Sequence, residues 1–103
     1  MKILNHNQFN EIKNKEGIKV VDFFADWCGP CKMLSPVLEQ LSEEMDESVE
    51  FIKINIDANL SLAQEYGVTT IPTLIYLKDG KEQDRTIGFI PKDSIKDKIS
   101  SIK

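Results

Sequence analysis

The stretch in which strand, turn and helix signals meet reads Val21-Asp22-Phe23-Phe24-Ala25-Asp26-Trp27-Cys28-Gly29-Pro30-Cys31-Lys32. It begins inside an apolar, β-rich run, Ile18 to Ala25, which predicts a central strand buried on both faces of a sheet. Gly29 and Pro30 favour a tight turn that leads into a helix. The stretch therefore predicts a strand that passes through a short turn into a helix, with two cysteines at the junction.

Cys28 and Cys31 are the only cysteines in the chain. Positions three apart in a helix's first turn share a face, so a disulfide can close and open there with little backbone movement. The free N–H groups and the dipole at a helix N-terminus stabilise the thiolate, which is the reactive form. We therefore expect a reversible couple in which Cys28 attacks a substrate disulfide and Cys31, pointing inward, resolves the mixed disulfide.

Two other uses of such a pair have to be weighed. A structural disulfide across so small a ring would remove little entropy from the unfolded chain. A zinc site needs about four ligands, and apart from this pair the chain offers only His6, far away in the sequence. The bare spacing suits metal and redox use equally, but Gly29-Pro30 between the cysteines favours redox chemistry and predicts no metal.

Composition narrows the class of protein. A length of 103 residues fits one domain over residues 1–103, and a net charge of −4 argues against binding nucleic acid. No apolar stretch is long enough to span a membrane. The segment from Met1 to His6 lacks the apolar core and cleavage site of a signal peptide. We expect a cytoplasmic protein, and in that compartment a lone cysteine pair is more often catalytic than structural.

Strand and helix signals alternate along the rest of the chain. Strands are predicted at Ile3–Leu4, Ile18–Ala25, Val49–Ile56, Thr73–Leu77 and Gln83–Ile87. Helices are predicted at Asn7–Glu16, Cys31–Met45, Leu60–Tyr66 and Pro91–Ile102. Asp79-Gly80 is a hairpin signal between the last two strands. The order βαβαβαββα predicts an α/β fold, a mixed sheet with helices on both faces, and the cysteines at the carboxyl end of a central strand.

The opening stretch resembles the active-site segment of the thioredoxin family. Ile71-Pro72-Thr73, Lys78-Asp79-Gly80 and Gly88 match the family farther along, so the resemblance covers nearly the whole chain. It implies a thioredoxin fold and a protein-disulfide reductase that acts on disulfide-containing proteins as a monomer. It also implies re-reduction by a thioredoxin reductase, because this chain has no glycine-rich nucleotide motif and is expected to carry no cofactor.

Two phenylalanines depart from the family pattern. Phe24 stands where many thioredoxins have tryptophan, and Phe89 stands where a small residue is frequent. The first change keeps an aromatic ring but loses an N–H donor, and the second enlarges the residue after Gly88. Partner preference therefore stays open.

Two charged residues are candidates for proton transfer. Asp22 lies inside an apolar strand run, where burial without a partner is unfavourable and raises a carboxyl pKa. The resemblance places Asp22 beneath the cysteines and implies that it is the general base and acid for Cys31. For Lys53, spacing alone favours a solvated lysine, whereas the resemblance implies a buried partner that tunes Asp22.

The remaining candidates would contact substrate. A trans bond before Pro72 is the expectation from base rates, but the resemblance implies a cis Ile71–Pro72 bond facing the cysteines. Ile71 would then offer its backbone to an extended substrate segment. An apolar rim for docking proteins is expected around Cys28. Its members are Trp27, Gly29, Pro30, Ile71, Gly88 and Phe89.

Two other functions remain compatible with the sequence. A thioredoxin-like chain can serve as a binding or scaffold module that uses its apolar rim without turnover. An oxidant or isomerase is the other alternative, because the redox potential depends on the relative stability of the thiolates and not on spacing alone.

Overall fold

The computed structural model describes residues 1–103, which is the whole chain. Its strands are β1 (Lys2–Ile3), β2 (Ile18–Phe24), β3 (Val49–Asn55), β4 (Thr73–Lys78) and β5 (Lys81–Ile87). Its helices are α1 (His6–Ile12), α2 (Gly29–Glu44), α3 (Leu60–Glu65) and α4 (Lys92–Ile102). The predicted order βαβαβαββα is confirmed. None of the helices has both the length and the apolar character that crossing a membrane would require.

The five strands form one mixed sheet in the order β1-β3-β2-β4-β5. β3 runs parallel to β1 and β2, β4 is antiparallel to β2, and β5 is antiparallel to β4. β2 therefore lies at the centre, as its apolar run predicts. In the ladder, Asp22 of β2 is paired with Lys53 of β3 on one side and with Leu74 of β4 on the other.

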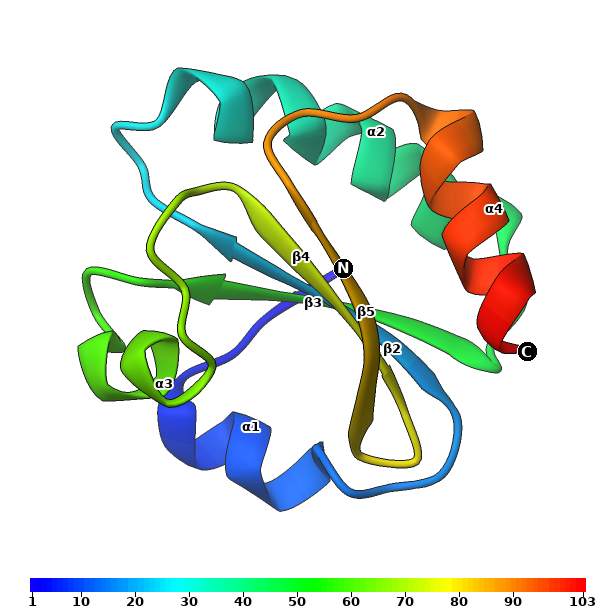
Figure 1. Ribbon diagram of the computed structural model, residues 1–103, viewed down its shortest axis with the longest axis horizontal. Coiled ribbons are helices and arrows are strands. Elements are labelled where there is room, and N and C mark those ends of the chain that lie inside the picture. Colours follow the sequence, from blue (N-terminus) through cyan, green and yellow to red (C-terminus); the bar gives the residue numbers. More distant parts are fainter.

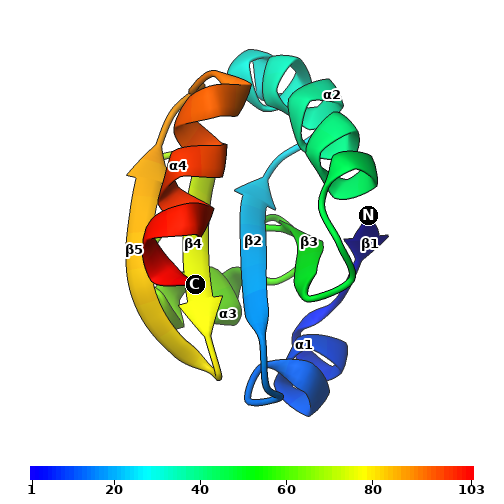
Figure 2. The ribbon, with the colours of Figure 1, turned by 90° about the vertical axis from the view of Figure 1, so that its right-hand side faces the viewer.

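The helices cover both faces of the sheet. Figure 1 shows α2 and α4 on one side and α1 and α3 on the other, and Figure 2 shows the same layers from a second direction. Alternate strand residues point to opposite faces, so each face has its own core. On the α2 and α4 side the core includes Val20, Phe51 and Leu74, and on the other side it includes Phe23, Ile54 and Ile75.

The predicted end of the first helix is wrong. The helix was expected to continue to Glu16 and stop at Gly17, but α1 ends at Ile12. Gly17 instead contacts the hairpin turn: its N–H donates to Asp79 Oδ1 at 2.8 Å, and its carbonyl accepts from Asp79 N at 3.0 Å. A φ of +106° suits glycine to this contact. The helix therefore gives way to a turn that docks on the β4–β5 hairpin.

The start of α2 lies two residues before the predicted one. Cys28 is the N-cap, with extended backbone angles (φ −88°, ψ 112°), and Pro30 occupies the first turn, where a missing N–H does no harm. The other predicted boundaries differ from the structure by one or two residues, as is usual for element ends. With its start at Gly29, α2 holds Cys31 in its first turn.

Candidate active site

The two cysteines are joined by a disulfide across the first turn of α2. Their Cα atoms are 5.2 Å apart, a separation that is common for disulfides. Cys31 N also donates a hydrogen bond to Cys28 Sγ at 3.2 Å. Cys28 therefore takes the place that a serine or aspartate usually occupies at a helix N-cap. The same N–H and the helix dipole would stabilise negative charge on this sulfur after reduction.

Both cysteines are buried in the disulfide form, each with only 4% of its surface exposed. They pack with Phe24 and Ala25 at the end of β2, and Ile56 and Ile71 pack against this cluster. The buried position of Cys31 agrees with the expected inward orientation. Cys28 is no more open than Cys31 here, because both sulfurs lie in the same apolar cluster.

Asp22 is a carboxylic acid with no hydrogen-bond partner for either oxygen. It is 1% exposed and lies between Val20 and Phe24 on the face of β2 that α2 covers. Burial raises the pKa of Asp22 from 3.8 to about 7, and the positive charge of Lys53 partly opposes the rise. The group can therefore take up and release a proton near neutral pH.

The Lys53 side chain extends from β3 to α2. Its ammonium donates to Ser35 Oγ at 3.0 Å and lies 4.3 Å from the centre of the Phe24 ring. These three side chains and Cys31 line a cavity of about 230 Å³ at the start of α2. The structure thus brings Lys53, one of the two predicted charged residues, and Cys31 to the same cavity.

Trp27 is the most exposed aromatic residue, with 68% of its surface open to solvent. Its indole N–H donates to Asp57 Oδ2 at 2.8 Å. Asp57 is held in turn by Asn55 Oδ1, which accepts from the Asp57 backbone N–H at 2.9 Å just after β3. The turn after β3 therefore fixes the ring that lies beside Cys28 in the sequence.

The Ile71–Pro72 peptide bond is cis, the geometry that the family resemblance implies. Ile71 packs against the cysteine cluster, so this segment lies beside the disulfide. Gly88 N donates to Pro72 O at 2.8 Å, which connects the end of β5 to the same segment. Phe89 is 43% exposed, and Gly29 and Pro30 are exposed as well.

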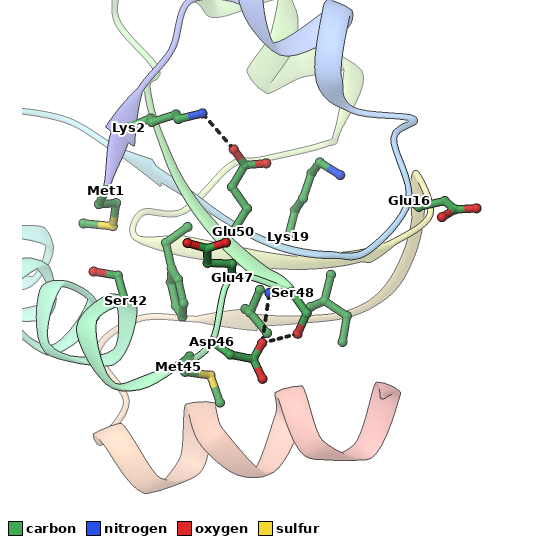
Figure 3. Close-up of a pocket in the computed structure, with 13 residues that line it drawn as sticks. Met1, Lys2, Glu16, Lys19, Ser42, Met45, Asp46, Glu47, Ser48 and Glu50 are labelled. Atoms are coloured by element: carbon green, nitrogen blue, oxygen red, sulfur yellow. Dashed lines mark hydrogen bonds and ion pairs between the residues drawn. The ribbon is translucent and has the colours of Figure 1, made fainter.

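The largest hollow on the chain lies away from the cysteines. It measures about 590 Å³ and lies where β2 and β3 begin and α2 ends (Figure 3). Among the residues that line it, Lys2 pairs with Glu50 at 3.1 Å, and Asp46 accepts hydrogen bonds from Ser48. No group of three or more His, Cys, Asp or Glu side chains is arranged to hold a metal ion. This hollow shares no residue with the cysteine site.

Sequence reasoning missed three residues around the site: Ser35, Ile56 and Asp57. Ser35 lies one turn after Cys31 on α2 and binds Lys53, whereas Ile56 and Asp57 both follow β3 and reach the site from a distant part of the sequence. Asp57 follows Asn55 in a pattern typical of a side-chain-capped turn, which is the only local signal for any of the three.

Comparisons with known proteins agree on one family. A family model described as Thioredoxin matches residues 1–101. A thioredoxin of Chlamydia caviae is 50% identical over 95 residues, covering 92% of this chain and 91% of the relative. A thioredoxin of Bacillus subtilis is 44% identical over 88 residues, covering 85% of each chain.

Solved structures match in three dimensions as well. A mutant thioredoxin from Halobacterium salinarum superposes with a TM-score of 0.87 at 36% identity, over 97% of this chain and 89% of the other. A Malassezia sympodialis thioredoxin gives 0.88 at 31% identity, over 98% and 89%. The mixed α/β architecture is thus a thioredoxin fold. The chain belongs to the thioredoxin family, and its Cys28–Cys31 pair makes it a thiol-disulfide oxidoreductase that reduces protein disulfides.

Proposed function

We propose that Cys28 is the nucleophile, Cys31 the resolving thiol and Asp22 the group that accepts and returns the Cys31 proton. The observation that carries this assignment is the position of Cys28 at the N-cap of α2, with a backbone N–H directed at its sulfur. A thiolate at that position is stabilised, whereas Cys31 has no such donor among the hydrogen bonds of the site.

The reaction begins when the Cys28 thiolate attacks one sulfur of a substrate disulfide. The substrate S–S bond breaks, a mixed disulfide forms, and the first substrate sulfur leaves as a thiolate that takes a proton from water. Cys31 then loses its proton to Asp22, and its thiolate attacks Cys28 Sγ. The mixed disulfide breaks, Asp22 gives its proton to the departing second substrate sulfur, and the protein carries the Cys28–Cys31 disulfide. The substrate has gained two electrons and two protons.

The proton step is supported by the chemistry of Asp22. Its carboxyl has a pKa raised to about 7, mainly by burial, and both oxygens are free of hydrogen bonds. A base with a pKa near the working pH combines a useful ionised fraction with a real affinity for the proton. Phe24 follows Asp22 by two residues, lies on the same face of β2, and packs with Cys31. Asp22 and Cys31 are therefore on the same side of the sheet.

An Asp22→Asn substitution tests this step. Resolution of a mixed disulfide preformed at Cys28 should slow, and its rate should no longer rise through pH 7 but follow the titration of the thiol, near pH 8.5 for a free cysteine. Asp26→Asn is the matched control, because Asp26 is a nearby carboxylate that is exposed. An unchanged rate and pH profile in Asp22→Asn would remove Asp22 from the mechanism.

We also propose that substrates dock on the rim around the disulfide. An extended segment would pair with the backbone of Ile71 beside Pro72, while Trp27, Gly29, Pro30, Gly88 and Phe89 contact its side chains. Exposure of Trp27 and Phe89 supports this role. Trp27→Ala and Phe89→Ala should raise KM for a protein disulfide and leave the reaction with a small disulfide unchanged.

We further propose that a thioredoxin reductase returns the electrons, and that the chain acts as a monomeric single domain in the cytoplasm. The similarity to curated bacterial thioredoxins supports this assignment. With a purified thioredoxin reductase, NADPH should be consumed in proportion to the disulfide reduced. If none of several purified thioredoxin reductases reduced the protein, the proposed donor would be wrong.

A further inference from the structure

The Lys53 ammonium forms no ion pair with the buried carboxyl of Asp22, although the two residues are partners in the sheet. The two residues face each other across neighbouring parallel strands, so both side chains start on the same face of the sheet. Yet the ion pairs of the chain all lie elsewhere, and neither Asp22 oxygen has a hydrogen-bond partner. A lysine directly opposite a buried carboxyl in the ladder would ordinarily be expected to pair with it.

Two contacts explain where the ammonium lies instead. Ser35 Oγ, on the second turn of α2, accepts its hydrogen bond at 3.0 Å, and the Phe24 ring lies beneath it at 4.3 Å from the ring centre. The ring attracts a cation but offers no hydrogen-bond acceptor. The hydroxyl of Ser35 is therefore the one directed contact that holds the ammonium on the cavity side.

We propose that the Ser35 hydroxyl is a positioning group that holds the Lys53 ammonium over the Phe24 ring and away from the Asp22 carboxyl. This inference rests on the proton-transfer role proposed for Asp22 and adds how that role is tuned. An ammonium in direct contact would stabilise the carboxylate and weaken its affinity for the Cys31 proton. An ammonium kept at a distance lowers the carboxyl pKa only in part, which leaves it near 7.

Lys53 is the one charged group near the cavity that acts strongly on the Asp22 pKa. Asp26, after β2, and Lys32, on α2, line the cavity but are exposed to solvent, which screens them. On β4 the residue opposite Asp22 is Leu74, which carries no charge. Cys31 does not titrate while the disulfide is closed.

The oxidised protein therefore gives a clean test. Carboxyl carbon NMR should resolve Asp22, because its midpoint near 7 lies well above the value of about 4 for ordinary aspartates. We expect Ser35→Ala to lower the Asp22 midpoint by about one pH unit, since the freed ammonium moves toward the unpaired carboxyl oxygens. Ser35→Thr keeps the hydroxyl and should restore the midpoint.

Two controls isolate the contact. Ser42→Ala makes the same change on the same helix, where the hydroxyl bonds only Glu39 O, and should leave the Asp22 midpoint unchanged. Lys53→Met should raise the midpoint, and Ser35→Ala should have no further effect in that background. The pH at which mixed-disulfide resolution reaches half its maximal rate should move with the carboxyl midpoint.

An unchanged or raised midpoint in Ser35→Ala would overturn the inference. An equal shift in the Lys53→Met background would overturn it as well, because the effect would not pass through the ammonium. Failure of the proposed function looks different. In that case Asp22→Asn would resolve mixed disulfides normally, while Ser35→Ala still shifted the carboxyl titration.

Discussion

The buried carboxyl of Asp22 makes a quantitative prediction about stability. In the unfolded chain it should release its proton near pH 3.8, whereas in the folded protein it holds the proton until about pH 7. Between these values the unfolded state binds fewer protons, so the free energy of unfolding falls as the pH rises. A shift of about three units corresponds to about 4 kcal/mol once both states are ionised.

The measurable part of this effect lies between pH 5 and pH 8. Over that interval the linkage relation gives a loss of about 2.5 kcal/mol for a group that titrates at 3.8 unfolded and about 7 folded. Asp22→Asn removes the titration, so the variant should escape this loss. Compared with the wild type, it should gain about 2.5 kcal/mol in unfolding free energy on going from pH 5 to pH 8.

Urea unfolding of the oxidised protein, followed by far-ultraviolet circular dichroism, measures this double difference. Comparing the variant with the wild type at both pH values cancels the titration of all other groups. It also cancels any fixed penalty of the buried amide. Asp26→Asn removes an exposed carboxylate close by and should show no such difference. A double difference indistinguishable from zero for Asp22→Asn would refute the argument, because the folded carboxylate would then have to be hydrated or paired.

Three further outcomes are expected. Cys31→Ser should accumulate a mixed disulfide with a protein substrate, visible by mass spectrometry and cleared by added dithiol; release of free substrate would contradict the resolving role. Asp57→Ala should free the ring of Trp27, the only tryptophan, by removing its hydrogen bond. The fluorescence anisotropy should fall, and KM for protein substrates should rise a few-fold. Unchanged anisotropy would mean that the hydrogen bond does not hold the ring. Gly80→Ala should lower the free energy of unfolding in urea by about 2 kcal/mol. The φ of Gly80 is +86°, and a Cβ there would lie 2.6 Å from Asn14 Oδ1. An unchanged free energy of unfolding would mean that the turn adjusts freely.

Local signals were sufficient for most of the fold. Every element and the order of the elements were predicted from three local signals. These were the apolar run of β2, the Asp79-Gly80 turn, and the alternation of strand-type and helix-type hydrophobic patterns along the chain. Both turn residues have positive φ, 52° and 86°, as a tight hairpin turn requires. The end of α1 was the exception, because Gly17 binds Asp79, a residue far along the chain.

The site was predictable only where a residue is unusual in its local sequence. A carboxylate among apolar strand residues is unusual in any sequence, and Asp22 could be singled out on that ground. Ser35 and Asp57 are common residues at unremarkable helix and loop positions. Their importance arises from contacts with Lys53 and Trp27, which depend on how α2 and the turn after β3 pack, and no local pattern encodes that.

The division of the core by the sheet has a consequence for how this protein can change. Asp22, Lys53, Ser35 and the cysteines all belong to the side that α2 covers, whereas the cluster around Phe9 and Ile54 lies behind the central strands. Substitutions behind the sheet can alter melting temperature with little effect on the electrostatics in front of it. The rear layer is therefore the place to engineer thermal tolerance, and the front layer the place to adjust reactivity.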